Sequence, residues 1–216
     1  MKKELCHVVM ETARALNRTG LNQGRSGNVS VRSGDGLLIT ASGAHFDSIT
    51  GDDVVFCDLQ GGWEGTRKPS SELSFHAAIY RERPDAGAVV HVHSPWATSL
   101  ACMHCHIPAY HYMIAVAGGV DIPCVPYATF GSEALAEHVT MGLRERDACL
   151  LANHGQIAVG SSADSALELA AEVENLARGY AQILAMGEPV LLDDREMGEV
   201  LVKFRSYHRN AQESES

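Results

Sequence analysis

Three histidines in this chain have the type and the spacing needed to hold a metal ion. His91 and His93 lie two residues apart in the apolar run GAVVHVHS (87–94), and His154 follows the apolar run ACLLAN. Because residues two apart in a strand project to the same face, the first two imidazoles can converge on one ion. His154 stands at a second strand end, from which its side chain can reach a shared cleft. Three neutral imidazoles with an open fourth position are typical of a catalytic zinc site.

Two other interpretations compete with a zinc site. The spacing of His91 and His93 taken alone favours an ordinary polar strand end, but an unpaired imidazole in so apolar a strand would lose its solvation without compensation. The segment CMHCH (102–106) matches the C-x-x-C-H pattern of haem attachment and also resembles a redox or zinc pair. Haem attachment goes with export, which the first residues do not suggest, and a second C-x-x-C is missing from the sequence. The three histidines therefore remain the preferred metal ligands.

Amide, hydroxyl and glycine residues form a second group with chemical potential. Asn28, the pair Ser42–Gly43 and the pair Ser70–Ser71 offer an amide, hydroxyls, a flexible backbone and a helix N-terminus. Such groups bind phosphate. Each of them alone is more typical of a turn or a cap. Together they matter because a chain with a formal charge of −10 would repel a phosphorylated substrate unless local donors held it.

Glu72 is the candidate acid and base. It falls in the first turn of the helix expected around 71–83, beside the proposed phosphate donors. An acid there also stabilises the helix dipole, which is the structural explanation for Glu72 taken alone. Next to zinc and a bound substrate, its carboxylate can instead shuttle a proton.

The elements that must position these groups follow from the periodicity of apolar residues and from turn signals. Alternating helical and extended patterns, with no internal repeat or linker, predict a single α/β domain over 1–216. The predicted helices cover 3–19, 71–83, 95–103, 132–146, 162–186 and 193–208, and the predicted extended segments cover 28–33, 37–40, 53–59, 87–94, 122–128 and 148–160.

Composition restricts the partners and the compartment. With 27 acidic and 17 basic residues, the chain disfavours binding to nucleic acid or to anionic membranes. Six scattered cysteines suit reduced thiols better than a disulfide framework, and no apolar run is long enough to span a membrane. We expect a cytoplasmic protein.

The motifs GNVSVR, TASG, KPSSE, HVHS and NHG, with the stretch IPAYHYMIAVAGGVDIPCVPYATFG, resemble the class II aldolase/adducin family over nearly the whole chain. The resemblance implies a three-layer α/β/α fold around a largely antiparallel sheet, and a homotetramer with active sites at subunit interfaces. In this family the positions of Glu72, His91, His93 and His154 bind zinc, and the glutamate leaves the metal to act as acid and base when substrate binds. Asn28, Ser42–Gly43 and Ser70–Ser71 match its phosphate-binding positions.

Three aromatic residues match further family positions. Tyr112 corresponds to a tyrosine that a neighbouring subunit contributes to move the proton on the aldehyde oxygen. Phe130 and Tyr207 correspond to positions that close the aldehyde side of the site. Packing at an interface or in a terminal helix is the alternative role for all three.

The implied activity is the reversible cleavage of a ketose 1-phosphate into dihydroxyacetone phosphate and a small aldehyde. L-Fuculose 1-phosphate and a related 5-deoxypentulose or 5-methylthioribulose 1-phosphate are the expected substrates. Ala41 and Leu73 depart from the family pattern and leave the choice of aldehyde open.

Three alternatives share this fold. A ribulose-5-phosphate 4-epimerase typically has aspartate in place of Glu72 and lacks the tyrosine at Tyr112, and a sugar-phosphate dehydratase needs the same metal and acid. A non-catalytic adducin-type module could discard the metal ligands, which this chain keeps.

Overall fold

The computed structural model of the chain describes residues 2–214, without the side chains of 205 and 207–214. Its centre is a seven-stranded sheet in the order β3-β2-β1-β4-β7-β6-β5. Every neighbouring pair is antiparallel except β5 and β6, so the predicted antiparallel character is confirmed. The strands are β1 (Asn28–Ser33), β2 (Gly36–Thr40), β3 (Val54–Asp58), β4 (Ala88–Val92), β5 (Cys124–Val125), β6 (Ala148–Leu151) and β7 (Gly155–Gly160).

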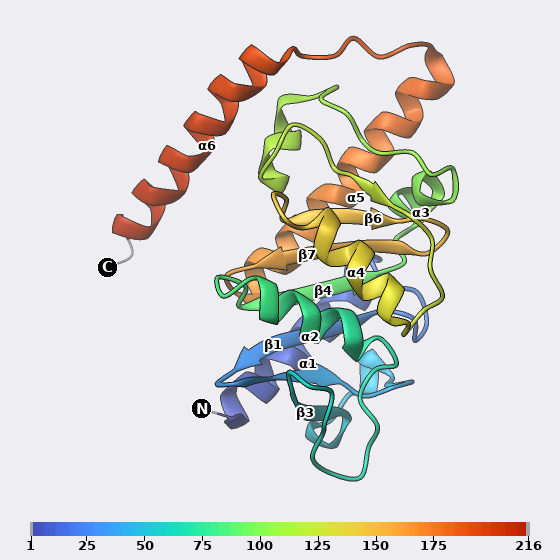
Figure 1. Cartoon of the computed structure of the whole chain (residues 1–216), viewed down its shortest axis with the longest axis vertical. Coiled ribbons are helices and arrows are strands. Elements are labelled where there is room, and N and C mark those ends of the chain that lie inside the picture. Colours follow the sequence, from blue (N-terminus) through green and yellow to red (C-terminus); the bar gives the residue numbers. More distant parts are fainter. Residues whose placement is uncertain (1, 215–216) are drawn as a thin grey trace.

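Helices cover both faces of this sheet, which gives the predicted α/β/α layers (Figure 1). One face is covered by α2 (Leu73–Glu82) and α4 (Glu133–Gly142), and the other by α1 (Lys2–Arg18), α3 (Pro95–Cys102) and α5 (Ala163–Met186). The last helix, α6 (Asp194–Ser214), runs away from the layers, and three short 3-10 helices complete the fold: η1 (Phe46–Ser48), η2 (Gly51–Asp53) and η3 (Tyr112–Ala117). Among the described helices, none combines the length and the apolar character that crossing a membrane requires.

The central strand β4 shows how the sequence builds two cores. All five of its residues are buried. Val90 and Val92 pack in the core under α5, while Val89 points to the opposite core under α2. By the same alternation His91 faces α2, where its ring meets Phe75 edge-on at a centroid distance of 5.4 Å. A buried imidazole on this face needs a polar partner.

Some boundaries differ from the predicted ones for local reasons. The segment predicted as extended at 122–128 forms only two residues of strand, because Pro123 and Pro126 flank it and cannot donate to a ladder. Helix α2 begins at Leu73, so Glu72 is its N-cap residue and not part of its first turn. The 3-10 helix η3 had no predicted counterpart, and α6 continues beyond the predicted end at 208.

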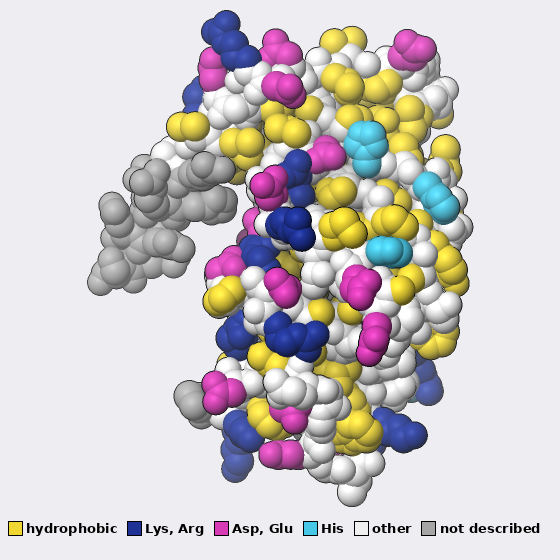
Figure 2. Space-filling model, in the orientation of Figure 1, with side chains coloured by type: hydrophobic (Ala, Val, Ile, Leu, Met, Phe, Trp, Pro, Cys, Tyr) yellow, Lys and Arg dark blue, Asp and Glu magenta, His cyan; other side chains and the backbone are white. Residues whose placement is uncertain are grey.

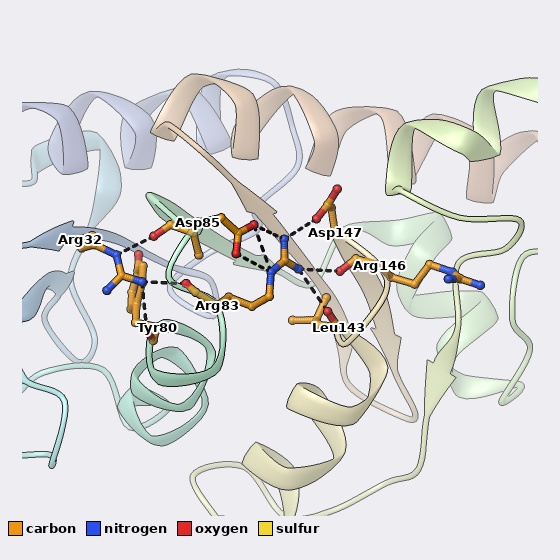
Figure 3. A network of polar contacts seen from close by, with 8 residues as sticks. Arg32, Tyr80, Arg83, Asp85, Leu143, Arg146 and Asp147 are labelled. Carbon is orange, nitrogen blue, oxygen red and sulfur yellow. Dashed lines mark hydrogen bonds and ion pairs between the residues drawn. The ribbon is translucent and has the colours of Figure 1, made fainter. Parts of the chain in front are cut away.

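The face that carries α2 and α4 has acidic and basic side chains interspersed (Figure 2). Beneath it, Arg83 at the end of α2 forms a network of polar contacts (Figure 3). Its guanidinium pairs with Asp85 (2.6 Å) and Asp147 (2.8 Å) and donates to the carbonyls of Leu143 and Arg146. These contacts tie the end of α2 to the end of α4 and the start of β6.

We expect Arg83→Met to lower the free energy of unfolding by about 2 kcal/mol, because it leaves two carbonyls and a partly buried carboxylate without their donor. The urea midpoint of the purified protein measures this change. Arg195→Met is the matched control, since its pair with Glu199 (3.4 Å) is exposed and its loss should cost less than about 0.5 kcal/mol. Equal midpoints for the two variants would contradict the role of the network.

Candidate metal centre

Four side chains predicted to bind metal converge in the structure. The ligand atoms of Glu72, His91, His93 and His154 all lie within 4.8 Å of one another. The Nε2 atom of His91 is 3.0 Å from Nε2 of His93 and 3.1 Å from Oε2 of Glu72. The Nε2 atom of His154 is 3.2 Å from Oε1 of the same carboxylate. Within the described residues, this is the one group of histidine, cysteine and acidic side chains close enough to share an ion.

The strand order explains the convergence. His91 lies near the end of β4 and His93 just beyond it, while His154 occupies the turn between β6 and β7. Because β4 pairs with β7, with Val92 opposite Gln156, the turn meets the end of β4. Gly155 permits this close approach, since a Cβ atom there would come within 2.5 Å of the Val92 carbonyl oxygen.

The spacing of the four ligands fits a divalent cation. Zinc binds nitrogen at about 2.0–2.1 Å in a tetrahedron, which places neighbouring ligand atoms about 3.4 Å apart. Three of the separations, at 3.0–3.2 Å, are close to that value, and all of the ligand atoms lie within 4.8 Å of one another. The Oε1 atom of Glu72 is also buried without a hydrogen-bond partner among the described residues, as expected of an atom reserved for a metal.

The hydrogen bond of His91 to the backbone fixes its tautomer. Its Nδ1 atom is 2.9 Å from the carbonyl oxygen of Gln156, and because a carbonyl only accepts, Nδ1 must carry the proton. The lone pair on Nε2 then faces the cluster. This support from the neighbouring strand is typical of metal-binding histidines.

The electrostatics of the cluster favour the ligand forms. Burial by itself raises the pKa of Glu72, but positive charge at the positions of His91 and His154 outweighs burial and holds that pKa well below its usual range. Burial, assisted by His91 and His154, lowers the pKa of His93 to about 3. An ionised carboxylate and a neutral imidazole are the forms that coordinate a metal.

The predicted phosphate-binding residues lie near one end of strands β1 and β2, on the same side of the molecule as Glu72. Asn28 opens β1 opposite His91 and donates its amide Nδ2 to Oε2 of Glu72 at 2.9 Å. The loops carrying Ser42–Gly43 and Ser70–Ser71 run alongside each other, joined by the bonds Ser42 N to Lys68 O and Ser70 N to Thr40 O, both 3.0 Å. Ser42, Gly43 and Ser71 are exposed, and their binding of phosphate stays a prediction.

Of the three aromatic residues that match family positions, Tyr112 and Phe130 are exposed on the single chain. Tyr112 opens η3, is 51% exposed and stacks on His111. Phe130 is 65% exposed, and Gly131 after it lies against the backbone of Ser71. The side chain of Tyr207 lies outside the described residues.

The cysteines take no part in the metal cluster. All six are free thiols, and none belongs to a group that could hold an ion within the described part of the chain. His104, from the C-x-x-C-H segment, lies with Nε2 at 2.6 Å from Oδ1 of Asn153, next to His154. That segment therefore contacts the turn that carries His154.

His76 is a polar residue of the site that the sequence pattern does not reveal. It is fully buried, with Nε2 at 2.5 Å from Oδ1 of Asn28 and Nδ1 at 2.7 Å from Oγ of Ser30. Its position one helical turn after Glu72, on the same face of α2, is the signal that could have identified it.

Comparison with known proteins agrees with this geometry. The model of the family described as "Class II Aldolase and Adducin N-terminal domain" matches residues 7–181. A 5-methylthioribulose-1-phosphate/5-deoxyribulose-1-phosphate aldolase of Rhodospirillum rubrum is 51% identical over 96% of this chain and 94% of its own. An L-fuculose phosphate aldolase of Escherichia coli (strain K12) is 48% identical over 95% of this chain and 96% of its own.

A solved structure of an L-fuculose 1-phosphate aldolase superposes with a TM-score of 0.90 at 38% identity, covering 94% of this chain and 96% of the other. The predicted fold, the predicted likeness to L-fuculose-1-phosphate aldolase and the aldolase class are confirmed by these relatives. The family is metal-dependent, in keeping with the cluster of three histidines and a glutamate. This chain belongs to the class II aldolase and adducin family.

Proposed function

We propose that this chain is a zinc-dependent aldolase that reversibly splits a ketose 1-phosphate into dihydroxyacetone phosphate and a small aldehyde. The observation that carries the proposal is the convergence of Glu72 with three histidines next to Asn28 and the serine loops. Three nitrogen ligands and one carboxylate favour zinc over magnesium or calcium, which prefer oxygen ligands. The cytoplasmic location stays a prediction.

Each residue has a distinct task in this proposal. A divalent ion in the cluster would supply Lewis-acid stabilisation of negative charge on the substrate oxygens. Asn28 and the loops of Ser42–Gly43 and Ser70–Ser71 hold the phosphate, which offsets the repulsion from a chain of formal charge −10. Glu72 is buried and held ionised. In the direction of aldol addition it takes a proton from a carbon of dihydroxyacetone phosphate, and in the direction of cleavage it returns the proton to that carbon.

The relatives guide the choice of substrates to test. Those compared above are named for L-fuculose phosphate and for 5-methylthioribulose or 5-deoxyribulose 1-phosphate. We expect zinc-loaded protein to release dihydroxyacetone phosphate from at least one of these ketose 1-phosphates, followed through a coupled NADH-dependent reductase. A product that keeps every carbon atom, as an epimerase would give, or loss of water without carbon–carbon cleavage would refute the proposal.

We also propose that the chain forms a homotetramer in which Tyr112 reaches the site of a neighbouring subunit. Its 51% exposure in the single chain leaves the phenol available for such a contact. Tyr112→Phe is expected to reduce cleavage by about 10²-fold, because the proton on the aldehyde oxygen loses its partner. Proton exchange at dihydroxyacetone phosphate should remain intact, since it does not involve the aldehyde.

Both rates can be measured on the same preparation, by coupled assay and by NMR. Trp63→Phe is the matched control, because Trp63 is 50% exposed on the loop that follows β3, at the far edge of the sheet. Unchanged cleavage in Tyr112→Phe would remove this assignment.

A further inference from the structure

A buried chain of hydrogen bonds leads from Glu72 into the interior. Asn28 Nδ2 lies 2.9 Å from Glu72 Oε2, and Asn28 Oδ1 lies 2.5 Å from His76 Nε2. The chain continues from His76 Nδ1 to Ser30 Oγ (2.7 Å) and from there to the hydroxyl of Tyr80 (2.9 Å). All five side chains are buried. We call this series, from Glu72 to Tyr80, the buried relay.

Two periodicities place the members of the buried relay together. His76 and Tyr80 are four residues apart and so share one face of α2, and Glu72, the N-cap residue, precedes His76 by the same spacing. Asn28 and Ser30 are two apart in β1 and project to the same side of the sheet. Arg32 fixes the far end of α2 by donating to the Tyr80 carbonyl at 3.0 Å (Figure 3).

The direction of every hydrogen bond in the relay can be deduced from its two ends. Asn28 donates from Nδ2 to Oε2 of Glu72, so its NH₂ group faces the carboxylate and its Oδ1 faces His76. Because Oδ1 only accepts, the Nε2 atom of His76 must carry a proton. Burial lowers the pKa of His76 to about 3, so the ring is neutral and its Nδ1 is an acceptor.

The remaining two hydroxyls complete the series. Ser30 must donate to Nδ1 of His76, and its oxygen is left to accept from Tyr80. Burial raises the pKa of Tyr80, so that hydroxyl keeps its proton. Each donor then points toward Glu72, and reversing one bond would set two acceptors or two donors against each other.

We propose that His76 is a positioning residue, which holds the carboxamide of Asn28 with its NH₂ group facing Glu72 and the bound substrate. The expected effect on catalysis rests on the proposed function, whereas the direction of the hydrogen bonds does not. A flipped amide would place Oδ1 against the carboxylate and withdraw both N–H donors from the site. His76 prevents the flip because its Nε2–H would then face the NH₂ group.

The first test compares two substitutions of one residue. His76→Phe keeps the ring volume but removes the donor, and we expect it to lower kcat/KM by about 10- to 100-fold with full zinc content. His76→Gln offers an amide N–H to Asn28 and should recover activity to within about fivefold of the unmodified protein. Thr12→Val is the control for a buried polar change across the sheet, and should keep kcat/KM within about twofold.

Equal kcat/KM in His76→Phe and the unmodified protein, or equal damage in His76→Phe and His76→Gln, would overturn the proposal. A second measurement needs neither a variant of His76 nor a substrate. The ¹⁵N NMR signals of the His76 ring in the zinc-loaded protein should show the proton on Nε2, and Asn28→Ala, which removes the acceptor of that proton, should move the ring toward a mixture of tautomers.

A proton on Nδ1 in the unmodified protein would refute the relay, whatever the enzyme acts on. Conversely, the correct tautomer in a protein that cleaves none of the ketose 1-phosphates would leave the relay standing and refute the proposed function.

Discussion

His93→Ala is expected to abolish zinc retention and to reduce aldol cleavage by at least about 1,000-fold, because the loss of one ligand opens the cluster. In the structure the Nε2 atoms of His93 and His91 face each other at 3.0 Å, and His93 is held neutral by burial. These two nitrogens, together with Nε2 of His154 and the Glu72 carboxylate, are close enough to share one cation. His93→Ala therefore removes one of the four proposed ligands and leaves a gap in the cluster.

Metal analysis of the purified protein, together with the coupled assay, measures this effect. His138→Ala is the matched control, since His138 lies on the exposed side of α4 and bonds only to the carbonyl of Pro126 among the interactions described. It should keep one zinc per subunit and its full activity. Stoichiometric zinc in His93→Ala would show that the cluster is not the metal site.

The four residues proposed as metal ligands could be singled out from sequence because each one follows from a local rule. Alternation in a strand places His91 and His93 on one side, and a short apolar run followed by Gly155 marks the turn of His154. Glu72 follows from the start of a helix. Local periodicity cannot show that Glu72 and His154, which are 82 positions apart, belong to one site. The resemblance to the aldolase family groups them.

The contacts that hold these ligands could not be predicted in the same way. His76 depends on the crossing of α2 over β1, and the acceptor for His91 depends on the register of β4 against β7. Such register is set by long-range pairing, whereas sequence periodicity shows only which face a residue occupies. Two boundaries also differ from the predicted ones: β5, which lies between two prolines, is shorter, and α2 starts later. Local chemistry at the ends of elements decides such boundaries.

Glu72→Gln separates the ligand role of the cluster from its acid–base role. We expect this variant to keep zinc through its three histidines but to lose about 10²- to 10⁴-fold in proton exchange at the carbon of dihydroxyacetone phosphate. Glutamine has the same shape, and its Oε1 can still accept from Asn28. What it lacks is a carboxylate oxygen that can take up the proton.

Deuterium incorporation followed by NMR, with metal analysis of the same sample, tests the division. Glu137→Gln on α4 is the control, because that carboxylate lies outside the cluster. Equal zinc loss in Glu72→Gln and His93→Ala would mean that the carboxylate serves mainly as a ligand. Unchanged exchange with full zinc would instead assign the proton transfer to a group other than Glu72.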